Sequence, residues 1–497
     1  MRHDGETATM PGLTAKIRHA WRRVVLASAA ALWAGPGLAA EDDARGMDGM
    51  DWVAELRAQE ETLAELEARG GPFDPMLIEP LQAMIRLLQE RGEHQRIAEL
   101  QQRQLGLMRT NFGLESPRLI PLLREMVLTG IRIGEAEQVT DHLQLIRHLS
   151  AAEDDPESLL RAMDSLAHWH LTGGAADSSQ QRARDFFKAR ELIEEAEEVA
   201  LELHGEDNPA MAPWLYRGAM NLYQVVAVIN TKAGLSGPAL RELVRHDGGM
   251  KLRTSARGFT FNPIGSTTVT PVVERGELVG ELYLREAMGK IDDIGEIFAS
   301  AENPEAEAMA MIYRADFQLL LDRGTAFGQY RDAIELLRGA GIAEDRIEHF
   351  FSRPQLLPAD RFHPTLEAAI ADHDAALAAS RPQDPQDPQT PQTKAVAHVP
   401  PFTAWDQSAP NMRAPVSANA FWELPANQHA VELEFNISSR GGVSAVNIIA
   451  AEPDDRRSRR LARDAARQLR FRPPLEEGRG QRLRDVRMQV LIPRRVD

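Results

Sequence analysis

Apolar side chains recur every three or four positions from residue 51 to about residue 380. A representative run is Leu81, Met84, Ile85, Leu87 and Leu88. This spacing gathers the apolar groups on one side of a helix, where they can pack against a neighbouring element. The pattern therefore predicts that most of the chain is helical.

Proline opens these helical runs at regular intervals. Asp74-Pro75, Ser116-Pro117 and Asp155-Pro156 begin three of them, with successive prolines 42 and 39 residues apart, and Asn208-Pro209 and Asn303-Pro304 begin two more. Asp, Ser or Asn before Pro is typical of a helix N-cap followed by proline at the first helical position. A start that recurs about every forty residues predicts stacked helical hairpins.

Two segments of this region resemble tetratricopeptide repeats. Gly328 to Leu337 resembles the second helix of such a repeat, in which a small residue, here Ala333, lets two helices approach closely. Residues 189–212 resemble the longer repeat variety of the kinesin-light-chain type. The resemblance implies a mainly α, tetratricopeptide-like solenoid over residues 41–380, with about four to six helical hairpins.

A stretch near residues 246–290 interrupts the helical pattern. It contains several glycines, Pro263 and a run of hydroxyl residues, and Val272-Val273 and Leu278-Val279 flank a possible turn. We expect a non-helical insert here with a β-hairpin. Such an insert either lies on the binding face of a solenoid or is a surface loop without a function.

Residues 381–401 are a proline-rich linker. Their prolines are spaced by three within RPQDPQDPQTPQ, a pattern typical of extended polyproline II. We expect a semi-rigid spacer that separates the helical region from the last domain, residues 402–497. Recognition of the proline motif by a partner is the alternative.

The last domain alternates apolar and polar side chains instead. Val431 to Ile437 and Asp485 to Ile492 predict strands with one covered and one exposed face. Between them lie a turn at Arg440-Gly441-Gly442, a second strand from Val443 to Ala450, and an arginine-rich helix. The pattern predicts a small α+β unit.

The arginine-rich helix has two different faces. Its apolar side comprises Leu461, Ala462, Ala465, Ala466 and Leu469. Its basic side comprises Arg456, Arg460, Arg463, Arg467 and Arg470. Arginines can pair with carboxylates or phosphates in bidentate fashion, so this side is a candidate for binding an acidic partner, lipopolysaccharide or peptidoglycan. Docking on the acidic helical region and an ordinary solvated helix face are the alternatives.

Several motifs of the last domain carry a family resemblance. They are Gly442-Val443 after the turn, Pro453 before the helix, Ala465-Ala466 within it, Arg470-Phe471-Arg472-Pro473 after it, and Gly478 before the last strand. With the alternating strands, these positions resemble the TonB C-terminal domain family over residues 429–495. The resemblance implies an exposed sheet edge that binds an extended segment of an envelope partner. Our candidate residues on the last strand are Val486, Met488 and Val490.

Residues 1–40 have the pattern of a secretory signal peptide. Basic residues from Lys16 to Arg23 precede an apolar run, Val24 to Ala34, and small residues follow. The apolar run is shorter than the roughly 20 residues that span a bilayer, so we expect cleavage near Ala39 or Ala40 and a periplasmic protein. The alternative is an uncleaved inner-membrane anchor, the one case in which we expect membrane contact.

Composition narrows the function classes further. The chain of 497 residues is too long for one hydrophobic core and carries a net charge of -17, which is a poor match to a nucleic-acid binder. The segment from His429 onwards is +5, because it has 15 Arg and 10 acidic residues, so the rest is -22. No cysteine is present, which excludes disulfides, thiol catalysis and zinc–thiolate sites.

No motif points to catalysis, a metal or a cofactor. His168 and His170 are two positions apart on a predicted helix, so their imidazoles point away from each other. We therefore expect a non-enzymatic periplasmic scaffold that binds envelope proteins, among which an outer-membrane TonB-dependent receptor is one candidate. The alternative is an anchored TonB-family energy transducer. A cell-wall hydrolase using residues 246–290 is a third hypothesis, with no motif in its support.

Overall fold

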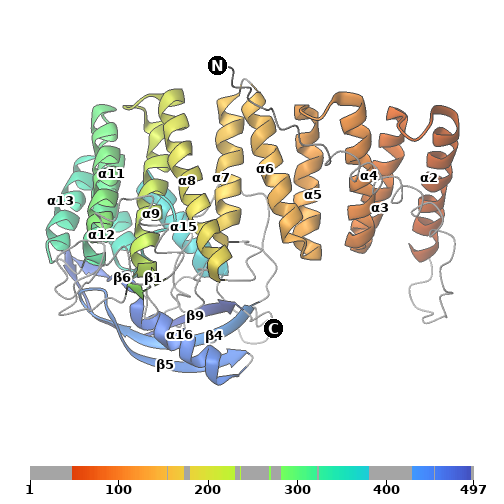
Figure 1. The fold of residues 1–497 in the computed structure, drawn as a ribbon. Coiled ribbons are helices and arrows are strands. Elements are labelled where there is room, and N and C mark those ends of the chain that lie inside the picture. Colours follow the sequence, from red (N-terminus) through yellow and green to blue (C-terminus); the bar gives the residue numbers. More distant parts are fainter. Residues whose placement is uncertain are drawn as a thin grey trace, which may run out of the picture. The chain divides into compact units, whose positions relative to one another are not determined.

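The computed structural model describes residues 48–153, 155–172, 179–229, 235–236, 268–269, 281–321, 324–379, 428–452 and 454–493. The chain is mostly helical with a small β region near its C-terminus (Figure 1). It divides into two compact units, residues 1–64 and 65–497, and the second holds every element from α3 onwards. None of the described helices combines the length and the apolar character needed to cross a bilayer.

The helical region is a series in which each described helix from α3 to α15 packs against the next (Figure 1). One continuous core runs through these helices from Leu105 to Ile370. The helices are α2 (Asp48–Gly70), α3 (Ile78–Arg91), α4 (His94–Phe112), α5 (Ile120–Ile133), α6 (Ala136–Ala152), α7 (Pro156–Thr172), α8 (Ser179–His204), α9 (Ala212–Ile229), α11 (Glu281–Ser300), α12 (Pro304–Leu320), α13 (Ala326–Gly339), α14 (Glu344–Phe351) and α15 (Leu366–Ala379).

The predicted helix starts are confirmed, and three of them begin with a short 3-10 turn: η2 (Pro75–Leu77), η3 (Pro117–Leu119) and η4 (Pro209–Met211). The Asp74 and Asn208 side chains each accept a hydrogen bond from the backbone N–H two residues on, at 2.9 and 3.0 Å. These bonds satisfy donors that have no partner within the helix. Ser116 occupies the same position without such a bond.

The insert is shorter than predicted, because α11 already begins at Glu281 rather than after residue 290. The first turns of α11 bury four side chains at helical spacing: Tyr283, Leu284, Ala287 and Met288. Their packing in the core stabilises the helix more than the nearby glycines destabilise it. The two-residue strand β2 (Thr268–Val269) within the insert pairs antiparallel with β1 (Leu235–Ser236), which precedes the insert. The expected hairpin at residues 272–279, the proline-rich linker and the N-terminal leader lie outside the described residues.

The C-terminal strands and helix occur where the pattern predicts them. The sheet is antiparallel in the order β5-β4-β9, from β4 (Gln428–Ile437), β5 (Val443–Glu452) and β9 (Leu483–Pro493). Helix α16 (Arg456–Gln468) covers one face of the sheet, as Figure 1 shows in blue. The core between them contains Val431, Leu433, Phe435, Ile437, Ala462, Ala466 and Leu469.

Candidate functional site

The C-terminal unit is joined to the helical region by a short pair of strands. Strand β3 (Gln355–Leu357) lies between α14 and α15, and it pairs antiparallel with β6 (Arg470–Arg472), directly after α16. Two further short strands, β7 (Leu475–Glu476) and β8 (Arg479–Gly480), follow β6. We call the contact between β3 and β6, with the side chains around it, the seam. The expectation that the linker keeps the two regions apart is therefore wrong.

At the seam, each of the two regions places one leucine side chain in the hydrophobic core of the other. Leu356 on β3 is 1% exposed and packs among the side chains of the C-terminal sheet, beside Phe471. Leu475 on β7 packs in the opposite direction, into the core of the helical region. Each region therefore completes the other's core, and separating them would expose both leucines to water.

A buried charge pair crosses the same seam. The Arg472 Nε atom lies 3.2 Å from the Asp316 Oδ1 atom on α12, and the two side chains are only 4% and 2% exposed. The Tyr330 hydroxyl on α13 donates a hydrogen bond of 2.6 Å to the same Asp316 oxygen. The Arg472 guanidinium also lies over the Phe350 ring, 4.5 Å from its centroid. Charge attraction and a cation–π contact thus hold Arg472 against two helices, α12 and α14.

Burial raises the pKa of the Asp316 carboxyl to about 6, although Arg472 and the Tyr330 hydroxyl both act to lower it. Desolvation outweighs the ion pair because the Arg472–Asp316 contact does not have hydrogen-bond geometry, and because the second Asp316 oxygen finds no hydrogen-bond partner among the described residues. At pH 7 the carboxylate is mostly ionised, so the pair exists as a charge pair.

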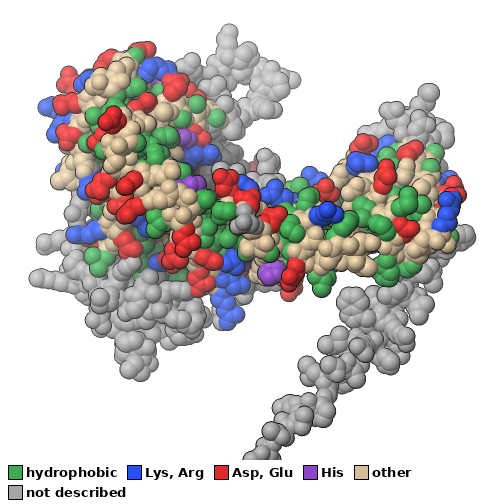
Figure 2. Space-filling view, turned by 90° about the horizontal axis from the view of Figure 1, so that it is seen from above, with side chains coloured by type: hydrophobic (Ala, Val, Ile, Leu, Met, Phe, Trp, Pro, Cys, Tyr) green, Lys and Arg blue, Asp and Glu red, His purple; other side chains and the backbone are tan. Residues whose placement is uncertain are grey.

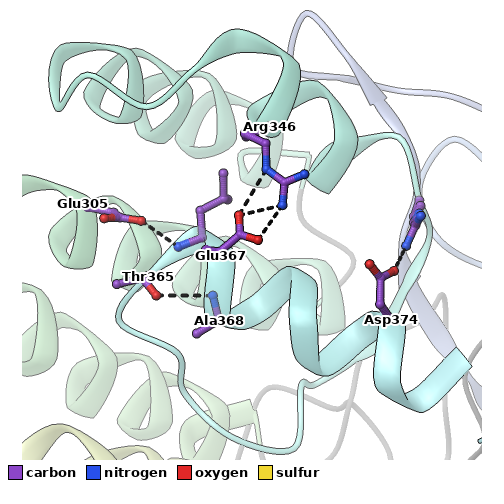
Figure 3. Close-up of polar contacts among 8 residues, drawn as sticks. Glu305, Arg346, Thr365, Glu367, Ala368 and Asp374 are labelled. Carbon is purple, nitrogen blue, oxygen red and sulfur yellow. Dashed lines mark hydrogen bonds and ion pairs between the residues drawn. The ribbon is translucent and has the colours of Figure 1, made fainter. Parts of the chain in front are cut away.

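Helices α14 and α15 are fixed around β3 by polar contacts (Figure 3). Arg346 on α14 donates three hydrogen bonds to Glu367 on α15: from Nε to Oε2 at 3.1 Å, and from Nη2 to Oε1 and Oε2 at 2.7 and 2.6 Å. The Leu366 backbone N–H donates to Glu305 on α12 at 2.8 Å, which joins the start of α15 to α12. Arg353 next to β3 forms an ion pair with Asp374. These contacts set the position of β3 from both sides.

Two glycines allow the close approach at the seam. Gly441 in the β4–β5 turn has a φ of +79°, and a Cβ atom there would lie 1.8 Å from the Phe471 carbonyl oxygen. Gly478 has a φ of +71°, and its Cβ atom would lie 2.1 Å from the Arg331 Cγ atom on α13. Both positions therefore require glycine. The sequence marks Gly478 only through the family resemblance, and the structure supplies its physical reason.

The predicted arginine face is present with one exception. Arg456, Arg460, Arg463 and Arg467 are exposed on the outer side of α16. Arg470 does not belong with them, because the helix ends at Gln468 and Arg470 lies half-buried on β6, where it bridges to Gly442.

The candidate residues on the last strand are placed differently from our expectation. Val486 and Met488 are 0% and 2% exposed, because they lie in the core of the C-terminal unit, and their side chains are not available to a partner. The Val490 backbone pairs with Val431, and its side chain is outside the described residues. The outer edges of β5 and β9 pair with no other described strand.

An acidic cavity of about 480 Å³ lies between α8, α9 and α11. Its carboxylates are Glu194, Glu197, Glu198, Glu206, Asp207, Glu286, Asp293 and Glu296. The sequence alone does not indicate this cluster, because the acidic side chains of α8 and α11 are about ninety positions apart in the chain. Figure 2 shows carboxylates over the described helices more widely, with basic side chains between them.

Like charges and burial both act on the carboxyls of this cavity. Burial raises the pKa of Glu197, which forms an ion pair with Lys290, and the neighbouring Glu194 and Asp293 raise it further. Burial also raises the pKa of Asp293, and Glu296 beside it adds to the shift. A cation in the cavity would favour the ionised form of both carboxyls.

His170 on α7 lies beside an acidic residue of the neighbouring helix α8. His170 is 7% exposed, and its Nδ1 atom lies 3.4 Å from an Asp185 oxygen on α8. Trp169 between the histidines donates a hydrogen bond of 2.9 Å from its Nε1 atom to the Thr140 hydroxyl. Throughout the described ranges, no three His, Cys, Asp or Glu side chains are grouped so as to hold a metal ion.

Comparisons with known proteins leave the family open. No protein-family model and no curated protein matches the chain. Among solved structures, it is similar to BtubC (BKLC) from P. vanneervenii, with 14% sequence identity and a TM-score of 0.25. That match covers 59% of this chain and 94% of the other. At this TM-score the likeness supports no conclusion about fold or function.

Proposed function

We propose that this protein is a non-enzymatic, periplasmic scaffold that binds other proteins of the cell envelope. In this proposal the helices are tetratricopeptide-like repeats, and the C-terminal unit is a TonB-like module that binds an extended segment of a partner. The observation that carries the proposal is the sheet β5-β4-β9, which is covered by α16 on one face and whose two outer edges pair with no further described strand. Such an edge offers backbone donors and acceptors to an added strand.

Strand β5 is the better edge for such a partner. Its side chains are exposed or half-buried along its whole length, and Ile449 is 42% exposed. Apolar side chains at an open edge provide specificity, while the backbone provides hydrogen bonds. The seam supports the proposal in a second way, because it holds the sheet against the helices, so that one partner can contact both.

A cross-linking pull-down from envelope fractions tests this function. The full chain should recover one or more envelope proteins, and Ile449→Lys should lose them, because a lysine on an edge strand blocks strand addition. Leu114→Lys is the matched control, since Leu114 is 69% exposed on the loop after α4. Equal recovery by all three proteins, or no recovery by the unaltered chain, would contradict the proposal.

The anchored energy transducer is separated from the scaffold by the mature N-terminus. Mass spectrometry that finds a mature start at Ala40 or Glu41 in the soluble periplasm excludes the transducer. A full-length N-terminus in the membrane fraction favours it.

A further inference from the structure

An exposed apolar patch lies on two neighbouring loops near the start of the helical region. Of the eight large apolar side chains that are most exposed among the described residues, four belong to it: Phe73, Met76, Phe112 and Leu114. The first two follow α2, and the other two lie at the end of α4 and directly after it. The Asn111 side chain on α4 donates a hydrogen bond of 3.0 Å to the Phe73 carbonyl oxygen, so the two loops lie side by side. We call these four side chains the loop patch.

The conformation of these loops does not require apolar side chains, as a third loop of the same kind shows. The loops at Gly71, Gly113 and Gly205 each begin with a glycine, at φ values of +87°, +95° and +84°. Each leads into a 3-10 turn that opens with proline four positions after the glycine. In the third loop, the two exposed positions after the glycine hold Glu206 and Asp207. Charged side chains therefore suit this backbone, and folding of the loop does not explain the apolar ones of the first two loops.

The loop patch is large enough for a weak protein contact. Its side chains are 59%, 64%, 37% and 69% exposed in chain order. At roughly 200 Å² for a fully exposed side chain of this size, they present about 450 Å² of apolar surface. Single apolar side chains are normal on a protein surface, whereas a contiguous patch of this size often marks an interaction site. Two such patches in contact would bury about 900 Å², which is typical of weak and transient complexes.

The charges beside the patch favour a second copy of this chain as the occupant. Glu115 and Arg118 on the second loop are both exposed, and neither forms an ion pair within the described residues. The Arg118 guanidinium lies at the patch itself, 5.1 Å from the centroid of the Phe112 ring. In a two-fold symmetric contact, a pair between two different residues occurs twice, once in each direction. The carboxylate of each copy can therefore pair with the guanidinium of the other.

A lipid bilayer fits the same charges less well. Glu115 directly follows Leu114, so insertion of that loop would remove water from the carboxylate without supplying a cation. We propose that two copies of this chain associate through the loop patch around a two-fold axis, with Glu115 of each copy paired to Arg118 of the other. This inference does not rest on the proposed scaffold function, because the β5 edge takes no part in the contact. A dimer of this kind presents two C-terminal units to envelope partners.

Sedimentation velocity of the full chain tests the association. We expect the average mass to rise reversibly from that of one chain towards that of two over about a hundredfold increase in protein concentration, because a contact of this size is weak. The mass of one chain at every concentration would overturn the proposal.

A double variant locates the contact in the loop patch. Phe73→Asp with Leu114→Glu gives the first two loops the side chains that the third loop carries as Asp207 and Glu206, so its melting temperature should be unchanged. We expect it to have the mass of one chain throughout. Leu282→Glu, at a 40% exposed position of α11, is the matched control and should associate as the unaltered chain does. Association of the double variant to the same extent as the control would place the contact elsewhere and overturn the proposal.

Reversal of the two charges separates a second copy from any other occupant. Glu115→Arg and Arg118→Glu each place like charges opposite one another in the dimer, so each variant alone should associate at least about tenfold more weakly. An equimolar mixture should restore association, because the arginines of one variant then meet the carboxylates of the other. A mixture that associates no better than the separate variants would contradict the two-fold contact.

Liposomes distinguish the remaining occupant. If the unaltered chain has the mass of one chain but floats with phosphatidylglycerol liposomes, and Phe73→Asp with Leu114→Glu does not float, the patch binds a bilayer and the proposal fails.

The dimer and the scaffold function also fail separately. Leu114→Lys should lose association and still recover envelope proteins, whereas Ile449→Lys should lose those proteins and still associate. If the unaltered chain recovers envelope proteins but never associates, this inference fails and the scaffold function stands.

Discussion

Replacement of Arg472 by alanine tests the seam most sharply. The change removes the guanidinium that lies 3.2 Å from the Asp316 oxygen and leaves that carboxylate buried without its cation. Because both side chains are at most 4% exposed, the small values typical of surface ion pairs do not apply. Coulomb attraction at this separation is about 5 kcal/mol at an effective dielectric constant of about 20.

Breaking a buried pair costs about 3–5 kcal/mol, so we expect Arg472→Ala to lower the free energy of unfolding by about that amount. The assay is urea unfolding of the full chain near pH 7, followed by circular dichroism. Hydrogen exchange should show the loss first in Gln355–Leu357 and Arg470–Arg472, since these strands meet at the seam. Arg463→Ala, on the exposed face of α16, is the matched control and should change stability by less than about 0.5 kcal/mol.

The stability lost in Arg472→Ala should become smaller as the pH falls from 7.5 to about 6. Arg472 lowers the pKa of Asp316, so the folded variant has a pKa above about 6 at this carboxyl and above its unfolded value. The variant therefore gains stability by binding a proton as the pH falls from 7.5, and its deficit shrinks until about pH 6, where the unaltered protein begins to gain as well. A deficit below about 1 kcal/mol near pH 7, or one that grows on acidification to pH 6, would refute this reasoning.

Three further predictions follow from the same structure. Gly441→Ala should destabilise the C-terminal unit by about 2 kcal/mol or more, measured by thermal unfolding, because the left-handed turn and the Phe471 carbonyl leave no room for a Cβ atom. Asn303→Ala should cost about 1 kcal/mol by urea unfolding, because the side chain accepts from the Ala306 N–H at 3.1 Å and caps α12. Burial, with Arg353 and Arg472 nearby, lowers the pKa of the His373 imidazole to about 4. The unfolded chain binds this proton near pH 6.5 and the folded protein only near pH 4, so the free energy of unfolding falls by about 3 kcal/mol as the pH drops from about 6.5 through 4. His373→Gln should therefore show a smaller loss of melting temperature between pH 7 and pH 4 than the unaltered protein.

The elements that depend on local pattern were predictable from the sequence. Alternation from Val431 to Ile437 identified β4, and the residue before each proline identified helix starts, because both signals lie within a few positions. Helical spacing alone also led to the wrong inclusion of Arg470 in the arginine face of α16. The periodicity of the sequence does not show that the helix ends at Gln468.

The seam was not predictable, because its parts are far apart in the chain. Strand β3 has three residues, too few for an alternating pattern, and its partner β6 lies more than one hundred positions away. In the sequence, Asp316 is one acidic residue of an amphipathic helix, and no nearby residue indicates its pairing with Arg472. The acidic cavity has the same origin, because its walls come from α8, α9 and α11 across the insert. Long-range pairing of this kind leaves no local signal.

An engineered disulfide tests most directly the central claim that the helical region and the C-terminal unit form one docked body. Leu357 and Arg470 are register partners across β3 and β6, which places their Cα atoms within about 5.5 Å, close enough for a disulfide. The chain has no cysteine of its own, so in Leu357→Cys/Arg470→Cys any intramolecular disulfide joins these two positions. On mild oxidation of dilute full-length protein we predict nearly complete intramolecular cross-linking by intact mass, against little in Leu357→Cys/Arg463→Cys. Equally low cross-linking in both variants would contradict the docked arrangement.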